Sequence, residues 1–184
     1  QDDATRKIGS IGRPNFYVET RIVDEDGADC ASGTPGELLL RGPMTTPGYW
    51  QDKAASAKAL QGGWFRTGDV VKQDDEGYFY VVGRLKEMYI SGGENVYPAE
   101  VERWLEKHPD IIDVAVIGVP DEKWGEVGSA VFVPLPGRSP SIERLSDFCR
   151  KGLARYKVPK HFTAVRELPK NATGKIDRRA LTEG

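Results

Sequence analysis

An aspartate beside a glycine is the first residue of this sequence that could bind a polar ligand. Asp69 follows Thr67-Gly68 within a run of strand-forming residues, so a break in the strand would project its carboxylate. A carboxylate accepts two hydrogen bonds at once, which suits the neighbouring hydroxyls of a ribose. The alternative is a solvated or turn-capping aspartate, and on the residues alone this alternative is favoured.

Two further residues of the next strand-like run could contact the same ligand. Arg84 ends that run, where its guanidinium could hydrogen-bond a ribose or an α-phosphate. It could equally be a surface arginine paired with Asp69 or Glu87. Tyr80 could form an aromatic wall beside a nucleotide, although core packing is the commoner use of a strand tyrosine.

A lysine near the end of the sequence could act on a phosphate. Lys175 follows Gly174 in the polar loop 169–177. When a carboxylate attacks an α-phosphate, an ammonium aimed at that phosphate would stabilise the charge of the transition state. A Gly-Lys pair is weak evidence by itself, because it lacks the remaining glycines of the P-loop signature and exposed lysines are common.

A pair of glycines lies between a short predicted strand at 88–91 and a helix that Pro98 opens. Gly92 and Gly93 allow positive φ angles and bring bare backbone close to a ligand. A tight turn before the helix explains the same residues without a ligand.

Strands, with turns about every ten residues, are expected to position Asp69, Tyr80 and Arg84. Short strands spaced in this way are typical of a small β-barrel or a distorted sheet. Asp52 is expected to cap the one helix, which Gly62-Gly63 ends. The predicted strands cover residues 15–24, 37–41, 64–72 and 78–82, with a turn at 74–77 between the last two.

From Lys86 onward the pattern alternates between helix and strand, which indicates a compact α+β domain of roughly 100 residues. Helices are predicted at 98–108, at 142–154 and from Asp177, and strands at 113–119, 128–134 and 162–167.

The composition is that of an ordinary globular protein and restricts the partners. Of 184 residues, 39% are hydrophobic and 29% are charged, and the net charge is −2. This balance argues against binding nucleic acid or an anionic membrane through bulk electrostatics. The four tryptophans, Trp50, Trp64, Trp104 and Trp124, are expected to be packing anchors rather than a binding cage.

Two cysteines lie far apart, without the spacing of a metal site or redox motif. Cys30 and Cys149 are therefore expected to be free thiols in a reducing compartment, so a cytoplasmic location is predicted. The sequence contains no apolar run long enough to span a membrane and no metal-binding cluster, so neither a membrane span nor a bound metal is predicted.

The motifs, taken in order, resemble one known superfamily. Four stretches resemble motifs of the adenylate-forming (AMP-binding) enzymes, which include acyl-CoA synthetases, peptide-synthetase adenylation domains and luciferases. They are Phe65-Arg66-Thr67-Gly68-Asp69, Gly83-Arg84-Leu85-Lys86, the stretch 91–102 and Asn171-Ala172-Thr173-Gly174-Lys175. The stretch 91–102 is most similar to fatty acyl-CoA ligases. The resemblance is to the C-terminal portion alone, so the chain is expected to be a fragment.

The resemblance implies an α+β architecture in two parts. Residues 1–83 would be the C-terminal β-rich subdomain of a large AMP-binding domain, here a small distorted β-barrel. Residues 84–86 would form a hinge, with Lys86 where the family more often has aspartate. Residues 87–184 would be a mobile C-terminal α+β domain.

The resemblance also implies an ATP-dependent acyl-CoA synthetase. A carboxylic acid, expected to be a fatty acid, and Mg-ATP would give an acyl-adenylate, from which the thiol of coenzyme A displaces AMP. The magnesium ligands are expected outside this chain, in the missing N-terminal part, so the chain alone is expected to be inactive. The implied roles are catalysis for Lys175, nucleotide binding for Asp69, Arg84 and Tyr80, a hinge at Lys86, and contact with the pantetheine arm for Gly92, Gly93 and Glu94.

Two other functions remain open on the sequence. An adenylation domain that loads a carrier protein would use the same pantetheine loop as one that uses free coenzyme A. A non-catalytic nucleotide-binding or interaction module could keep the same fold, although intact Asp69, Arg84 and Lys175 argue against it.

Overall fold

The computed structural model describes residues 5–182 and confirms an α+β protein. The chain divides into two compact units, one up to Lys86 and the other from Glu87 onward. Between Thr5 and Thr182, no helix has both the length and the apolar character needed to cross a bilayer.

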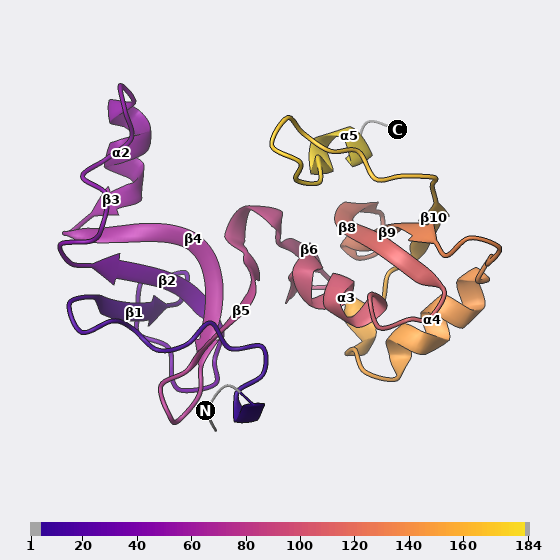
Figure 1. The fold of residues 1–184 in the computed structure, drawn as a ribbon, viewed down its shortest axis with the longest axis horizontal. Coiled ribbons are helices and arrows are strands. Elements are labelled where there is room, and N and C mark those ends of the chain that lie inside the picture. Colours follow the sequence, from indigo (N-terminus) through magenta and orange to yellow (C-terminus); the bar gives the residue numbers. More distant parts are fainter. Residues whose placement is uncertain (1–4, 183–184) are drawn as a thin grey trace. The chain divides into compact units, whose positions relative to one another are not determined.

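The first unit is built on a curled antiparallel sheet of five strands, in the order β1-β2-β4-β3 with β5 also on β4 (Figure 1). Its strands are β1 (Glu19–Val23), β2 (Gly36–Arg41), β3 (Leu60–Gln61), β4 (Trp64–Gln73) and β5 (Phe79–Arg84). The predicted pairing of β4 with β5 is confirmed. Closure of this sheet into a barrel stays a prediction.

Strand β4 organises this sheet because both of its edges are paired. Phe65 lies opposite Leu40 of β2 on one edge and Leu60 of β3 on the other. Further along, Val70 lies opposite Glu37 of β2 and Gly83 of β5. Strands β3 and β5 therefore share one edge of β4, one after the other.

A short helix connects β2 to β3, as the sequence predicts. Helix α2 (Lys53–Ala59) begins after Asp52, whose carboxylate accepts the backbone N–H of Ala55 at 2.8 Å. Capping of this kind satisfies one of the free N–H groups of a first helical turn. Gly62 and Gly63, with φ of 59° and 81°, then turn the chain into β4.

The second unit contains another five-stranded sheet, in the order β10-β9-β6-β7 with β8 on the other edge of β9. The sheet is antiparallel except that β10 runs parallel to β9. Its strands are β6 (Tyr89–Ser91), β7 (Glu94–Val96), β8 (Ile111–Asp121), β9 (Gly125–Pro134) and β10 (His161–Ala164). The β8–β9 hairpin is longer than predicted, because the pairing continues to Asp121 and Gly125 at its turn.

Two helices of this unit are shorter than predicted. Helix α3 (Pro98–Leu105) ends before His108, since the residue that precedes Pro109 is disfavoured in helical geometry. Helix α4 (Ile142–Arg150) ends before Gly152, where a Cβ would lie 2.0 Å from the ring of Trp104. The chain then forms a 3₁₀ turn, Arg155–Lys157, and the last described helix is α5 (Arg178–Thr182).

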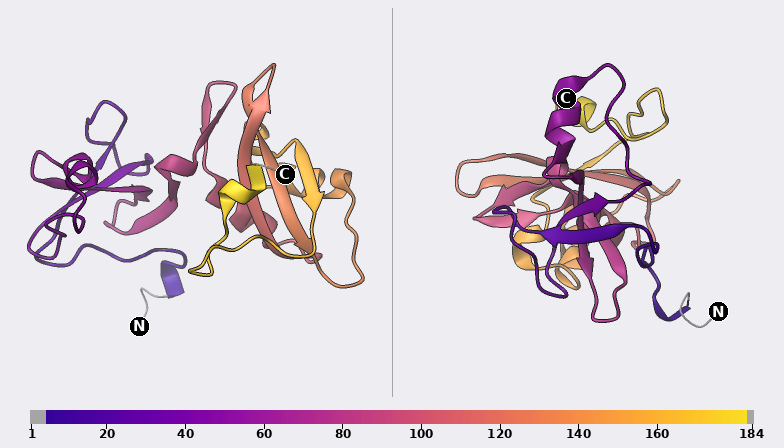
Figure 2. Two further views of the ribbon diagram at one scale, coloured as in Figure 1. Left: turned by 90° about the horizontal axis from the view of Figure 1, so that it is seen from above. Right: turned by 90° about the vertical axis from the view of Figure 1, so that its left-hand side faces the viewer.

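Alternating residues of β8 and β9 give the second sheet an apolar core on each face. Val114, Val116, Ala130 and Phe132 belong to the larger core, with α3 and α4 against it. Ala115 and Val131 belong to a smaller core that the C-terminal segment covers through Leu168, Ile176 and Leu181. Figure 1 shows α3 and α4 on the opposite side of the β8–β9 hairpin from α5, and the left view of Figure 2 shows the C-terminal segment (yellow) beside that hairpin.

Candidate functional site

The structure brings Asp69 and Arg84 together across neighbouring strands. They are partners in the β4–β5 register, and Nε of Arg84 lies 2.6 Å from Oδ1 of Asp69. The side chain of Asp69 is 32% exposed and that of Arg84 is 50% exposed. A pair this exposed is weak in water, so a ligand hydroxyl or phosphate can replace part of it at little cost.

A bulge in β4 holds the Asp69 carboxylate in place. Gly68 has a φ of 70°, and the pairing with β2 shifts register here. Thr67 Oγ1 donates to the carbonyl of Leu38 at 2.8 Å and accepts the N–H of Asp69 at 3.1 Å. The predicted interruption of the strand is therefore confirmed, as a bulge within one continuous strand.

A buried acid behind this bulge was not found from the sequence. Glu37 is 6% exposed, forms an ion pair with Arg66, and accepts the N–H of Gly68 at 3.2 Å. It is the lone charge among the buried positions of β2, whose sequence is Gly-Glu-Leu-Leu-Leu-Arg. Burying an unpaired acid in such an apolar run costs free energy. The position of Glu37 in this run was therefore the signal that could have predicted a paired, buried acid.

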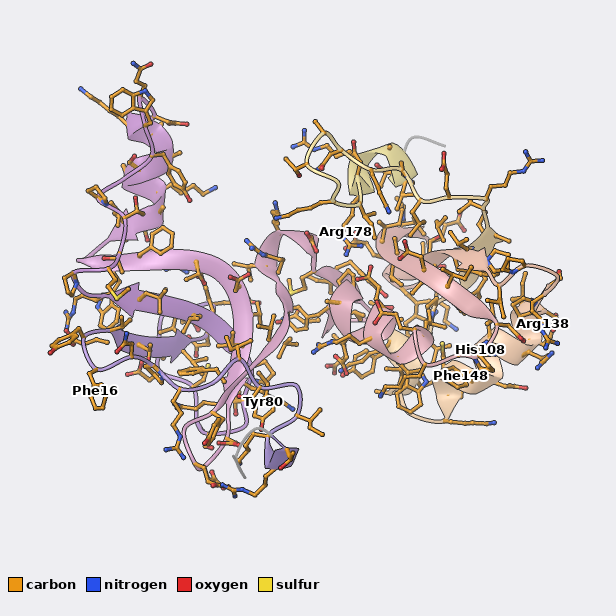
Figure 3. The ribbon with its side chains drawn as sticks, in the orientation of Figure 1. Phe16, Tyr80, His108, Arg138, Phe148 and Arg178 are labelled. Atoms are coloured by element: carbon orange, nitrogen blue, oxygen red, sulfur yellow. The ribbon has the colours of Figure 1, made fainter. Side chains whose placement is uncertain are left out.

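Tyr80 is placed at the other end of β5 from Arg84 and has a different partner. Its hydroxyl donates to the carboxylate of Asp74 at 3.3 Å, next to the β4–β5 turn (Figure 3). Lys7, 2.6 Å from the same carboxylate, is the main reason why the pKa of Asp74 falls to about 2. A contact between Tyr80 and a nucleotide stays a prediction.

Lys86 lies where the two units meet in sequence. It is the middle residue of a 3₁₀ turn, Leu85–Glu87, and its side chain is exposed. The division between the units falls directly after it. A hinge at Lys86 stays a prediction.

Gly92 and Gly93 form the two-residue turn of the β6–β7 hairpin. Ser91 pairs with Glu94 across it, and the φ angles of 62° and 88° are those that two-residue hairpins require. The N–H of Gly92 donates to the carbonyl of Trp124 at 2.9 Å, which leaves the exposed Gly93 and Glu94 at the tip. The tight turn is thus confirmed, and contact with a pantetheine arm stays a prediction.

We expect Gly92→Ala to destabilise the protein more than Gly93→Ala does. Both changes place a Cβ at positive φ, which costs about 1–2 kcal/mol. At Gly92 the Cβ would also lie 2.7 Å from the ring of Trp124, whereas nothing lies within 4 Å at Gly93. Overpacking of this kind adds about 1–3 kcal/mol. Thermal unfolding of the two variants measures the difference, and equal midpoints would contradict the contact.

A basic and aromatic pocket of about 770 Å³ lies next to this turn, within the second unit. Trp124 is 42% exposed and lines the pocket, while its ring also packs against Gly92. Trp50 is 89% exposed, so the expectation that it is a packing anchor is wrong. The charged and aromatic residues of the lining are Lys123, Trp124, Arg150, Arg155, Tyr156, Lys160 and Phe162.

Lys175 is exposed on a loop whose backbone is well fixed. The N–H of Asn171 donates to the carbonyl of Lys175 at 2.8 Å, and the side-chain oxygen of Asn171 accepts the N–H of Lys175 at 3.1 Å. Gly174, with a φ of 79°, makes the turn. Within the described chain, no ion pair holds the Lys175 ammonium, so it is free to meet an anion.

The structure gives no evidence for a metal site in the part of the chain that it describes. Across residues 5–182, no group of three or more His, Cys, Asp or Glu side chains could hold a metal ion. Cys30 and Cys149 are free thiols.

Comparison with known proteins gives matches along nearly the whole chain. A family model described as AMP-binding enzyme matches residues 1–50, and one described as AMP-binding enzyme C-terminal domain matches residues 100–175. The chain spans about a third of the length of the curated relatives it matches.

Three individual matches illustrate the range. An indoleacetate–CoA ligase of Aromatoleum aromaticum is 52% identical over 95% of this chain and 34% of the relative. A long-chain-fatty-acid–CoA ligase of Mycobacterium tuberculosis is 43% identical over 99% of this chain and 36% of the relative. The solved structure of an o-succinylbenzoate CoA synthetase from Bacillus subtilis, in complex with its acyl-adenylate intermediate, matches with a TM-score of 0.91 and 39% identity, covering 98% of this chain and 37% of that one.

Proposed function

Because this chain belongs to the AMP-binding enzyme family, we propose that it is the C-terminal part of an AMP-forming acyl-CoA synthetase. The observation that carries the proposal is that the first unit has a partly exposed, replaceable Asp69–Arg84 ion pair, while the second has an exposed Lys175 on a fixed loop, with no ion pair among the described residues. These are the groups needed to hold a ribose and to stabilise a phosphate under attack.

In the first step, the substrate carboxylate attacks the α-phosphate of ATP, and pyrophosphate leaves. Asp69 accepts hydrogen bonds from the ribose hydroxyls, and Arg84 contacts the ribose or the α-phosphate. The Lys175 ammonium stabilises the negative charge that gathers on the α-phosphate in the transition state.

Bound Mg²⁺ would neutralise phosphate charge in this step. The described residues lack an acidic cluster for it, and we expect its ligands outside this chain.

In the second step, the thiol of an acceptor attacks the carbonyl carbon of the acyl-adenylate, and AMP leaves. The Gly92–Gly93 turn offers backbone without side chains along which an extended pantetheine arm can lie. We propose that rotation about Lys86 exchanges Lys175 for this turn between the two steps.

We propose free coenzyme A as the acceptor rather than a carrier protein, since the pocket next to the turn is basic and aromatic. The nucleotide end of coenzyme A carries a diphosphate, a ribose phosphate and an adenine ring. Arg155 and Lys123 have no ion pair with another residue of the described range. The rings of Trp124 and Tyr156 line the same pocket, and Nζ of Lys123 lies 5.0 Å from the centre of the Trp124 ring. Such a lining suits phosphates and a base together.

We expect Arg155→Glu and Lys123→Glu each to raise the KM for coenzyme A by about tenfold, because a repulsive charge replaces an attractive one. The KM for pantetheine, which lacks the nucleotide, should change less than about twofold. Lys151→Glu, an exposed charge outside the pocket lining, is the matched control. Equal effects on both acceptors would contradict a nucleotide site in the pocket.

The acid is the least defined substrate. The relatives named above act, by their names, on indoleacetate and on long-chain fatty acids, so we propose an organic carboxylic acid. A fatty acid is the narrower proposal, and the mycobacterial relative supports it. The two free cysteines support a cytoplasmic location as part of the same proposal.

The 184 residues alone are expected to be inactive, because the chain spans only about a third of its relatives. When the isolated chain is given ATP, a carboxylic acid and labelled pyrophosphate, its rate of ATP–pyrophosphate exchange should not exceed that of its Lys175→Ala variant. Exchange above that control would show that the chain holds a complete adenylation site.

A further inference from the structure

On the outer edge of β8, the backbone N–H and carbonyl of Val116 are hydrogen-bonded by side chains and not by a neighbouring strand. Among the described strands β8 pairs only with β9, yet both polar backbone groups of Val116 have partners on its other side. The N–H of Val116 donates to Oε1 of Glu102 at 2.7 Å, and its carbonyl accepts Nη1 of Arg178 at 2.9 Å. One buried acid from α3 and one cation from α5 therefore satisfy the backbone of Val116, in the middle of this edge.

Each of the three nitrogens of the Arg178 guanidinium has a partner within the described residues. Nη1 and Nη2 bond the two oxygens of Glu102 at 2.6 and 2.9 Å, and Nε lies 3.2 Å from the carboxylate of Glu87. Only 23% of the Arg178 side chain is exposed, and 10% of that of Glu102. A planar fork fits two parallel bonds of this kind, and a lysine ammonium does not.

The same arginine fixes the end of the Lys175 loop. Within the loop the hydrogen bonds are internal, from Asn171 to Lys175 and from Asp177 to Pro169. The loop is attached to the rest of the unit by apolar contacts of Leu168 and Ile176 and, three residues after Lys175, by Arg178. Apolar contacts hold a segment against a surface but restrict its direction less than oriented hydrogen bonds do.

We propose that Arg178 is a positioning residue for Lys175: its bonds to Glu102, Val116 and Glu87 set the direction in which the Lys175 loop points. This proposal rests on the proposed adenylation role of Lys175. Glu87 directly follows Lys86, so the same guanidinium links the loop to the segment in which we propose the hinge. An ion pair that only stabilised the fold would, when weakened, change the two half-reactions alike, whereas a positioning residue for Lys175 affects adenylation first.

The test compares Arg178→Lys and Arg178→Met with Arg179→Lys in the full polypeptide of the ligase. Arg179 is the exposed neighbour in α5, so Arg179→Lys controls for an arginine-to-lysine change in this helix that breaks no buried ion pair. Two properties are measured: hydrogen exchange of residues 169–177 relative to β8 and β9, and the rates of the two half-reactions. The double variant Glu102→Gln with Arg178→Met avoids an unpaired buried acid, should the single Met variant not fold.

Arg178→Lys keeps the charge but not the fork. We expect faster exchange in residues 169–177 with unchanged exchange in β9, and adenylation slower by about tenfold to a hundredfold, as for other displaced catalytic groups. Thioester formation from supplied acyl-adenylate should change less than about threefold. Arg179→Lys should leave all of these unchanged.

Unchanged exchange in residues 169–177, or an equal fall of both half-reactions, would overturn the positioning role. The role of Lys175 itself is judged separately by Lys175→Ala. If that variant adenylates normally, the proposed function fails, and the exchange data still decide whether Arg178 holds the loop.

Discussion

Replacing Lys175 by alanine is expected to slow acyl-adenylate formation by about a hundredfold to a thousandfold, the usual effect of removing one aimed charge-stabilising group. Thioester formation from supplied acyl-adenylate should change less than about threefold, because the α-phosphate is no longer under attack in that step. The ammonium has no ion pair within the described chain, so its removal leaves no buried partner uncompensated. The loss should therefore appear in catalysis and not in stability.

Pyrophosphate exchange measures the first half-reaction, and release of AMP from supplied acyl-adenylate and coenzyme A measures the second. Lys170→Ala is the matched control, since Lys170 is an exposed lysine of the same loop whose backbone pairs with Ile176. An equal fall in both half-reactions would contradict the proposed division of labour between Lys175 and the Gly92–Gly93 turn.

Asp69→Asn is expected to raise the KM for ATP by about ten- to a hundredfold. Hydrogen bonds to a charged group contribute about 1.5–3 kcal/mol, and an amide gives up the charge and one of the two acceptors. Stability should change little, because the Asp69–Arg84 pair is partly exposed.

The decisive comparison for Asp69 uses ATP and its 2′,3′-dideoxy analogue. The unmodified protein should discriminate between them strongly, while Asp69→Asn should bind the two almost equally, because the partner of the hydroxyls is weakened. Asp26→Asn, at an exposed turn of the first unit, controls for loss of charge. A variant that discriminates as well as the unmodified protein would place the ribose elsewhere.

Local signals accounted for much of the fold. The cap at Asp52 and the turn between β4 and β5 each lie within a few residues of the element they shape, so the sequence reveals them. The prediction that Gly62 and Gly63 end α2 was wrong, because the helix ends before Leu60 and the glycines form the turn between β3 and β4. Strand β7 was missed because its three residues follow a glycine turn and carry no visible alternation. Helix α4 was predicted too long because the contact of Gly152 with Trp104 joins residues far apart in the chain.

The supports of the candidate site were not predictable in the same way. Glu37 contacts Arg66 over 29 residues of sequence, and Glu102 contacts Arg178 over 76. A motif indicates which side chain could meet a ligand, and on that basis Asp69, Arg84 and Lys175 are predicted. It does not show which distant residue holds that side chain in place.

The hydrogen bonding of Val116 at the edge of β8 has a consequence for synthesis of the protein. The β8–β9 hairpin is local and can form as soon as residue 134 is available, but the carbonyl of Val116 waits for Arg178, made 44 residues later. Until then the carbonyl of Val116 and the carboxylate of Glu102 both lack their cation at an edge of the sheet, and unsatisfied strand edges recruit strands from other molecules. Truncation before Arg178 should therefore lead to aggregation as well as inactivity.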